Sequence, residues 1–424
     1  MNRADYWQIF RMVIIFGVIG LAEYYSFIVV RSAVRNLSAP VRITLLTTYV
    51  FLTVITWLGL ILFRQINWAN VPHLLRNVYI AFVLGFVVGK ILILLVMLID
   101  DLRRLITWAI TAIAYNNTAD TAAPQDGGIA RSVFLKRTAL VLGGLSVLGF
   151  SYGISNRYKY RVRKIKLKLA GLPDAFKGLK IVQISDIHTG SFDDHGAVAH
   201  GIQRVMDQQA DIIFFTGDLV NNHADEVDEK YQKMYSTLNA PMGVYSTLGN
   251  HDYGDYVQWP TPQAKIDNLD KLKAMHAAMG WKLMMNEHVI LERGNDKIAL
   301  IGIENWSAKA NFPKYGDMRK AYAGLKEKNV PVKILLSHDP SHWHAQVVPE
   351  YGDVQLTLSG HTHGMQFGID TKWYKWSPVQ YMYKEWAGLY TQGDQNLYVN
   401  RGFGFLGYPG RLGVLPEITV FELV

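Results

Sequence analysis

Hydrophobic and polar positions follow different patterns in the two parts of the chain. Before about residue 155, long apolar runs with few charges predict membrane-spanning helices, because a hydrocarbon core of about 30 Å takes about 20 helical residues to cross. Four runs carry this pattern, the last of them shorter, richer in glycine and only marginally long enough: residues 9–30, 43–63, 78–99 and 138–154. We therefore expect a transmembrane region over residues 1–155. Between its third and fourth spans, residues 102–114 are predicted to continue as a helix and residues 116–128 to form a flexible loop.

Two ionisable residues lie deep in these spans, Glu23 in the first and Lys90 in the third. The two spans run in the same direction, and at about 1.5 Å rise per residue the two side chains differ little in depth. Isolated charges in hydrocarbon are costly, so such residues usually face the bundle interior and pair. We expect a contact between Glu23 and Lys90. The alternative is that both side chains reach headgroups or water.

The second domain, residues 156–424, opens with alternating positions. Ile165, Leu167 and Leu169 would share one face, and lysines the other, which predicts a half-buried strand over residues 161–169. A tether this short would hold the domain close to the bilayer. Further on, short apolar runs predict buried strands at residues 180–185, 211–216, 243–248, 297–303, 332–336, 356–359 and 397–399. Helical periodicity predicts helices at residues 198–208, 227–238 and 263–279, and the strand–helix–strand order implies parallel neighbours.

Aspartate, asparagine and histidine follow directly after five of these strands. The ends of parallel strands meet at one edge of a sheet, where ligands collect, and carboxylate, amide and imidazole groups are metal ligands. One such histidine alone would usually be an ordinary core or surface residue, but the repetition of this pattern favours a single metal centre. The residues are Asp186, His188, Asp218, Asn250, His251, Asp252, His338, His361 and His363.

These segments, Asp-x-His, Gly-Asp, Gly-Asn-His-Asp, His and Gly-His-Thr-His in this order, resemble the calcineurin-like metallophosphoesterases, and in particular membrane-anchored bacterial members, which include hydrolases of UDP-2,3-diacylglucosamine. The resemblance spans most of residues 161–424. It implies an α/β fold, a four-layer αββα sandwich of two mixed β-sheets flanked by helices, here preceded by an all-α transmembrane bundle. It also implies two divalent ions: one held by Asp186, His188, Asp218 and His363, the other by Asp218, Asn250, His338 and His361.

The resemblance implies a hydrolase of phosphodiester or pyrophosphate bonds. Two such ions can lower the pKa of a bridging water and clamp the phosphoryl oxygens, so we expect metal-bound hydroxide to attack phosphorus without a phosphoenzyme. His251 is the candidate for stabilising the transition state or protonating the leaving oxygen, with Asp252 orienting it. Manganese is the expected metal, with iron or zinc as alternatives. The competing hypotheses are a tethered phosphodiesterase of broad specificity and a membrane sensor that binds ligands without hydrolysis.

Aromatic residues gather just after the Gly-His-Thr-His segment, among them Trp373 and Trp376. Such side chains favour bilayer interfaces and can line a groove for acyl chains, so we expect a lipid-linked phosphoester substrate. The alternative is a loop packed on its own domain. Arg401, after the strand at residues 397–399, could contact phosphate, although a structural salt bridge is the commoner role for an arginine.

Composition adds two limits. The chain has no cysteine, which excludes disulfides, thiolate ligands and a cysteine nucleophile. The net charge of +8 concentrates beside the apolar segments, so it favours lipid headgroups over nucleic acid as the partner. We expect a multi-pass protein of the inner membrane. The distribution of positive charge leans towards a cytoplasmic catalytic domain, whereas residues 131–136 resemble a twin-arginine export motif, so the side stays open.

Overall fold

The structure, a computed structural model, describes residues 3–62, 65–66, 71–115, 128–309 and 312–424. The chain divides into two compact units, Met1–Tyr152 and Gly153–Val424. The dividing point lies near residue 155, where the apolar pattern ends. Most of the predicted loop at residues 116–128 lies outside the described residues, as do the side chains of Arg131 and Ser132 in the segment that resembles an export motif.

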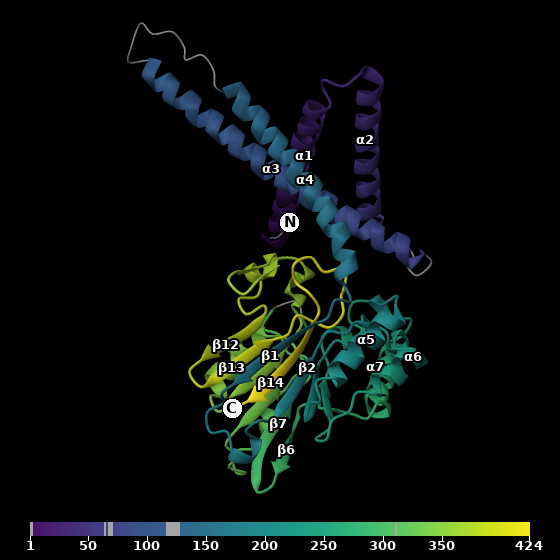
Figure 1. Cartoon of the computed structure of the whole chain (residues 1–424), viewed down its shortest axis with the longest axis vertical. Helices are drawn as coiled ribbons and strands as arrows, with labels where there is room; N and C mark the ends of the chain where they lie inside the picture. The colour runs from purple at the N-terminus through teal and green to yellow at the C-terminus, as the bar shows by residue number, and fades with distance from the viewer. Residues whose placement is uncertain (1–2, 63–64, 67–70, 116–127, 310–311) are drawn as a thin grey trace. The chain divides into compact units, whose positions relative to one another are not determined.

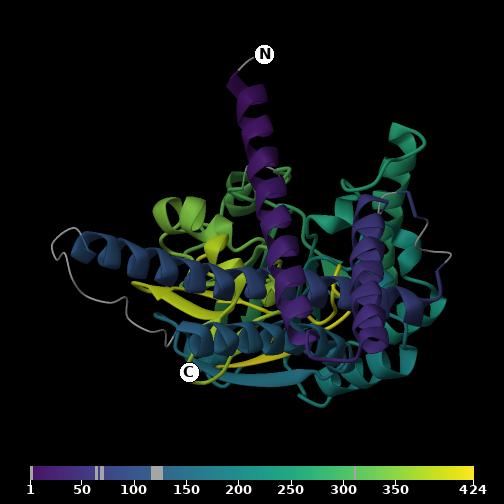
Figure 2. The same ribbon diagram turned by 90° about the horizontal axis from the view of Figure 1, so that it is seen from above.

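The first unit consists of long helices (Figure 1; Figure 2). They are α1 (Arg3–Ala33), α2 (Ala39–Ile61), α3 (His73–Tyr115) and α4 (Gly128–Gly153). Stretches long and apolar enough to cross a membrane lie at Val13–Ala33, Ala39–Ile61, His73–Ile113 and Val133–Asn156, the last of which runs three residues past the end of α4. The predicted third span and its helical extension form one continuous helix. The fourth span, predicted to be marginal, covers 24 residues, which is as long as the first two spans of 21 and 23 residues.

The predicted contact between Glu23 and Lys90 is confirmed. Lys90 Nζ donates to both carboxylate oxygens of Glu23, at 2.6 and 2.8 Å. Two side chains of α2 complete the group, since Lys90 also donates to Thr53 Oγ1 at 3.1 Å and Trp57 Nε1 donates to Glu23 at 2.7 Å. The two charges therefore neutralise each other inside the bundle, where an unpaired charge would be costly.

Glycine lets α3 and α4 approach closely. A Cβ atom at Gly89 would lie 2.8 Å from the carbonyl oxygen of Gly143, and one at Gly85 would lie 2.7 Å from Cα of Val147. Small residues four positions apart are a common way for helices to pack in lipid, where the hydrophobic effect does not drive association. Gly143 of the marginal fourth run thus serves helix packing, together with Gly85 and Gly89 of α3.

The second unit is a four-layer αββα sandwich built on two mixed six-stranded sheets, as the resemblance implies (Figure 1). The first sheet has the order β1 (Arg161–Leu167), β14 (Glu417–Leu423), β2 (Lys180–Ile184), β3 (Ile212–Thr216), β4 (Val244–Thr247) and β5 (Trp281–Leu283). The second has the order β12 (Gly388–Gln392), β13 (Gln395–Val399), β9 (Leu356–Ser359), β8 (Lys333–Leu336), β7 (Asp296–Gly302) and β6 (Glu287–Arg293). A short hairpin pairs β10 (Ile369–Asp370) with β11 (Lys375–Trp376).

The residues of β3 explain why its apolar run is unbroken. Ile212 and Phe214 point into the core between the two sheets, whereas Ile213 and Phe215 point into the core under the helices. A strand covered on both faces has no polar side, so it reads as continuous hydrophobic sequence. The helices on that outer face are α5 (His195–Met206), α6 (Glu229–Tyr235) and α7 (Pro262–Ala278), which lie together beside the first sheet in Figure 1.

The outer face of the second sheet packs against α8 (Met318–Tyr322) and the segment that ends in α9 (Val348–Glu350). The predicted parallel pairing of β2 with β3 is confirmed, and β4 continues it in the same direction. In the second sheet β7, β8, β9 and β13 are also parallel. Several strand ends of both sheets therefore meet at one edge, and the candidate site lies there.

Candidate metal centre

The residues predicted as ligands come together from the ends of the parallel strands. Asp186 and His188 follow β2, Asp218 follows β3, and Asn250 follows β4. From the second sheet, His338 follows β8, and both His361 and His363 follow β9. Six of the seven are buried, and the side chain of His361 is only 10% exposed. So many buried polar groups at one point require partners, since burying an unsatisfied polar group is costly.

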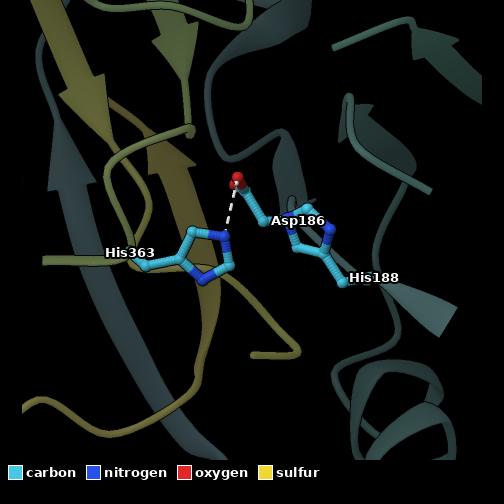
Figure 3. Close-up of side chains that lie close together, drawn as sticks. All are labelled: Asp186, His188 and His363. Carbon is cyan, nitrogen blue, oxygen red and sulfur yellow. Dashed lines mark ion pairs between the residues drawn. The ribbon is translucent and has the colours of Figure 1, made fainter. Parts of the chain in front are cut away.

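One group of possible ligands contains Asp186, His188 and His363, which offer one atom each within 4.8 Å of one another. Figure 3 shows the carboxylate of Asp186 directed at the imidazole of His363, with Oδ1 and Nε2 3.3 Å apart. The ring of His188 lies alongside, with 4.9 Å between the centres of the two imidazoles. One carboxylate and two imidazoles are a suitable donor set for a divalent transition metal.

A second group contains Asp218, His338 and His361 within the same limit. The amide oxygen of Asn250 adds a neutral donor, 2.8 Å from Nδ1 of His361. Asp218 faces both groups: its Oδ2 lies 3.2 Å from Nε2 of His338 and 3.5 Å from Nε2 of His188. This is the position that a carboxylate shared by two cations would need.

Imidazole nitrogens without a hydrogen-bond partner indicate whether the cluster is suited to bind a metal ion. Among the residues that the structure describes, Nε2 of His188, His338 and His363 is buried without a hydrogen bond. Each of these atoms lies 3.2–3.5 Å from an oxygen of Asp186 or Asp218. Two ligand atoms about 2.1 Å from one cation are themselves about 3.0–3.4 Å apart. The spacing therefore fits donors that share a cation.

Hydrogen bonds on the far side of the rings set which nitrogen faces inward. Nδ1 of His338 lies 2.7 Å from the carbonyl oxygen of Thr216, and Nδ1 of His188 lies 3.1 Å from Oδ1 of Asn221. A carbonyl oxygen can only accept, so in the neutral rings Nδ1 carries the proton and Nε2 offers its lone pair. Outer partners of this kind usually orient metal-binding histidines.

Charge and burial keep most of the cluster in the metal-binding protonation state. Burial lowers the pKa of His188 to about 3 and also lowers the pKa of His361 and His363. Burial alone would raise the pKa of Asp218, but the neighbouring histidines, His338 first, hold it well below its usual range. His338 is the exception: burial opposes its charge, yet Asp218 raises its pKa to about 10. A proton on His338 would thus compete with a cation.

Asp252 does not orient His251, and that expectation was wrong. Its carboxylate accepts hydrogen bonds from the backbone N–H groups of Asp218 at 2.9 Å, Leu219 at 2.8 Å and Gly249 at 2.8 Å. Asp252 therefore joins the loops after β3 and β4. The ring of His251 is held instead by the carbonyl oxygen of Asn221, 2.7 Å from Nδ1, which leaves the lone pair of the neutral ring on Nε2.

Tyr383 is a contact of the cluster that the sequence did not indicate. Its hydroxyl lies 2.8 Å from Nε2 of His361 and donates to Oδ2 of Asp339 at 3.3 Å. The tyrosine belongs to the stretch at residues 365–390, named here the aromatic segment. Thr362, between the two histidines after β9, is tied to the same segment by a 2.7 Å hydrogen bond from its hydroxyl to the carbonyl oxygen of Trp386. The aromatic segment is therefore attached directly to the candidate site.

The aromatic segment has two faces. Tyr383 and Trp386 are buried with Val379 and Val414, as the alternative of a loop packed on its own domain would require. Other members remain outside: Trp373 is 87% exposed and Tyr381 79%. Trp376 is half-buried beside Phe367. Neither tryptophan belongs to the two ligand groups, and a substrate contact for them stays a prediction.

Arg401 has a structural role in place of the suggested phosphate contact. Its side chain is only 1% exposed. Its guanidinium donates to Glu417 at 2.6 Å and forms a second ion pair with Asp370 at 3.0 Å. Both carboxylates lie within its own domain, so the structural salt bridge is the interpretation that the structure supports.

Two family models match the chain, one on each unit. The model for the calcineurin-like phosphoesterases matches residues 179–365, which include all seven predicted ligands. The model described as "Probable Calcineurin-like phosphoesterase, transmembrane domain" matches residues 8–157. The combination of a transmembrane bundle with this hydrolase domain is therefore a recurring one.

Three relatives illustrate the range of similar proteins. The chain is 31% identical to the uncharacterized metallophosphoesterase YkuE of Bacillus subtilis over 70% of this chain and 98% of that one. It is 29% identical to the transmembrane protein with metallophosphoesterase domain of Danio rerio, over 67% of this chain and 62% of that one. It is 28% identical to the UDP-2,3-diacylglucosamine pyrophosphatase LpxG of Chlamydia muridarum, over 54% of this chain and 78% of that one. With its own membrane-spanning helices, the chain belongs to the calcineurin-like metallophosphoesterases, hydrolases that act on phosphoester bonds.

Proposed function

We propose that this membrane phosphoesterase hydrolyses a phosphodiester or pyrophosphate bond of a lipid-linked substrate at a pair of divalent cations. The buried donor set carries the proposal. Asp186, His188 and His363 would hold one cation, and Asn250, His338 and His361 the other, with Asp218 shared between them. Manganese is the first choice and iron or zinc the alternatives, since imidazole and carboxylate donors suit all three.

A bound pair of cations supplies a water of lowered pKa and charge compensation for the phosphoryl oxygens. The protein's own residues supply position and protons. The carboxylate of Asp252 fixes the loops that carry Asp218 and Asn250, through hydrogen bonds from four backbone N–H groups. His251 is held at Nδ1 by Asn221, so its Nε2 is the atom to carry a proton to the leaving oxygen.

Two observations favour a lipid-linked substrate over a soluble one. The LpxG relatives are named for a pyrophosphatase activity on a diacylated sugar nucleotide. The aromatic segment presents exposed side chains, led by Trp373, and bonds through Tyr383 to His361. Amphipathic aromatic side chains suit a boundary between water and acyl chains. The segment would thus hold the acyl part of the substrate while the cluster acts on its phosphate.

The test compares substrates with and without acyl chains. We would assay the full chain in detergent with manganese on UDP-2,3-diacylglucosamine, on UDP-N-acetylglucosamine and on bis(4-nitrophenyl) phosphate. We expect kcat/KM for the diacylated substrate to be at least 100-fold above that for UDP-N-acetylglucosamine, which carries only one acetyl group. Comparable values would favour the tethered phosphodiesterase of broad specificity, and no hydrolysis of any phosphoester would favour the ligand-binding sensor.

A pair of variants connects that preference to the aromatic segment. Trp373→Ala is expected to lower kcat/KM for the diacylated substrate about tenfold, equivalent to about 1.4 kcal/mol, and to leave hydrolysis of the soluble diester unchanged. Ile266→Ala is the matched control, since Ile266 is an exposed apolar side chain on α7. Equal losses in both variants, or equal losses on both substrates, would contradict the assignment of the acyl part to this segment.

A further inference from the structure

Two cavities flank the C-terminal end of α1 in the membrane unit. The larger, of about 690 Å³, lies between α1 and α2 and is lined by Ile28, Arg31, Ser32, Arg35, Arg42 and Leu46. The smaller, of about 240 Å³, lies between α1 and α4 and includes Lys136 and Arg137. Ser32 and Arg35 line both cavities. The two therefore share one wall, and Arg35 is its central cation.

Five cations around these cavities have no acidic partner among the described residues. Within the part of the chain that the structure describes, Arg31, Arg35, Arg42, Lys136 and Arg137 form no ion pair with an aspartate or glutamate, whereas Arg103 and Arg104 on α3 both pair with Asp100. Unlike that pair, the five cations are not neutralised by any carboxylate of the described residues. An anion from outside the chain would complete them.

The cations lie at the ends of the apolar spans. The span Val13–Ala33 ends two residues after Arg31. The span Ala39–Ile61 begins three residues before Arg42, and the span Val133–Asn156 begins three residues before Lys136. These are the depths at which lipid phosphates meet a transmembrane helix. A general role in membrane orientation explains positive charge at this depth, but it does not require the charges of three helices to line shared cavities.

Apolar residues form the deeper part of the larger cavity. Ile28 lies one helical turn into the span from Arg31 and Ser32, and Leu46 lies one turn into the span from Arg42. A cavity with cationic residues at the end of the span and apolar residues one turn deeper fits a molecule that carries a phosphate at one end and a hydrocarbon chain at the other. A free phosphate ion has no apolar part that could contact these deeper residues.

We propose that the cavities at the end of α1 bind the phosphate headgroup of an anionic phospholipid, whose first methylene groups lie against Ile28 and Leu46. Arg31, Arg35 and Arg42 bind the phosphate between α1 and α2. Lys136 and Arg137 attract the remaining negative charge of the headgroup from α4. The lipid would tie three helices together at this depth, and the site is separate from the proposed hydrolytic centre.

The test measures lipid-dependent stability of the full chain. After purification and delipidation in a neutral detergent, thermal unfolding would be followed while phosphatidylglycerol, cardiolipin, phosphatidylcholine or inorganic phosphate is added. We expect the two anionic lipids to raise the Tm at low micromolar concentration and the other two additives to have no effect. Equal stabilisation by phosphatidylcholine would overturn the requirement for negative charge, and equal stabilisation by inorganic phosphate would overturn the assignment to a lipid.

Variants locate the effect. Arg35→Gln and Arg42→Gln are expected to weaken the apparent affinity for phosphatidylglycerol at least tenfold, and Arg35→Lys to retain most of it. Arg104→Gln is the matched control, because Arg104 is a cation of α3 that pairs with Asp100 and lines neither cavity. A loss in Arg104→Gln as large as in Arg35→Gln would reduce the effect to overall charge and overturn the proposal. An unchanged Tm without lipid shows that each variant is folded.

Discussion

Five of the seven proposed ligands have backbone angles that residues with side chains rarely adopt. The φ angles are 53° at Asp186, 51° at His188, 62° at Asp218, 70° at His361 and 51° at His363. Each such residue costs on the order of 1–3 kcal/mol, and residues of this kind gather at functional sites. The side chains must be needed there, since glycine would relieve the strain. At Gly217 the opposite holds, because a Cβ atom there would lie 2.6 Å from the backbone nitrogen of Gly249.

The hydroxyl of Tyr383 gives a prediction about one of the two proposed cations. Tyr383→Phe removes the hydrogen bonds to His361 and Asp339. Losing an outer partner of a ligand typically weakens metal affinity about 10- to 100-fold, so we expect that loss for the cation held by His361 and little change for the other. Calorimetric titration of the metal-free chain with Mn²⁺ measures both affinities.

Tyr381→Phe is the control for this experiment, since Tyr381 is an exposed tyrosine of the same segment. Wild-type affinity in Tyr383→Phe, or an equal loss at both cations, would contradict a role for Tyr383 through His361.

His276 gives a prediction about pH, at a position away from the cluster. It is fully buried against Trp281, with Nδ1 2.9 Å from the hydroxyl of Ser246, and burial lowers its pKa to about 3. The unfolded chain, with a pKa of about 6.5 at this residue, binds the proton more readily. Its contribution to stability is therefore complete above about pH 6.5 and falls as the pH drops towards 3.

Between pH 7.5 and pH 5 we expect the free energy of unfolding to fall by about 2 kcal/mol more in the wild type than in His276→Gln, because glutamine does not titrate. Unfolding free energies of both proteins in detergent, followed by tryptophan fluorescence at the two pH values, give the difference. Identical pH dependence of the two proteins would show that His276 is not buried in its neutral form.

At the scale of elements, local patterns identified the strands that carry the ligands. Asp186 and His188 follow an apolar run of strand length, as do His361 and His363, so both the strands and their functional ends could be predicted. Other elements have no such local signal. β14, at the C-terminal end of the chain, pairs between β1 and β2. The pattern of apolar residues in 417–423 does not indicate which strands it pairs with. Tyr383 was missed for the same reason, because only the folded segment brings it to His361.

The Glu23–Lys90 pair gives a prediction about three helices at once. Glu23→Gln leaves the charge of Lys90 buried among α1, α2 and α3, whereas Glu23→Gln combined with Lys90→Met removes both charges. Breaking one partner of a buried pair typically costs about 3–5 kcal/mol, and replacing both is often nearly neutral. We expect a clear fall in Tm for the single variant and recovery of most of it in the double variant, measured in detergent. An equal fall in both would contradict the pairing.

Close contact between α3 and α4 gives a second prediction about helix packing. Gly89→Ala places a methyl group 2.8 Å from the backbone oxygen of Gly143, so the helices must separate, and we expect a lower Tm. Gly144→Ala is the matched control, because a Cβ at Gly144 has no atom within 4 Å and alanine favours a helix over glycine. Equal effects of the two substitutions would contradict close packing at Gly89.

At the scale of the molecule, a membrane bundle and a hydrolase domain are joined in one chain. Hydropathy alone divided the sequence near residue 155, and the structure divides it between Tyr152 and Gly153. The four layers of the second unit followed from resemblance, because periodicity finds strands but not the order in which they pair. Charge was the least informative property at this scale, since its distribution along the chain does not fix the membrane side of the catalytic domain.

Hydrolysis at two cations can be tested by a metal titration of turnover. The full chain would be stripped of metal and returned to activity by stepwise addition of Mn²⁺, with UDP-2,3-diacylglucosamine as substrate. We predict that turnover is absent without metal, is complete only after two equivalents per chain, and is not restored in Asp218→Asn, which lacks the carboxylate that faces both groups. Full turnover with one equivalent, or turnover that survives removal of metal, would contradict the account.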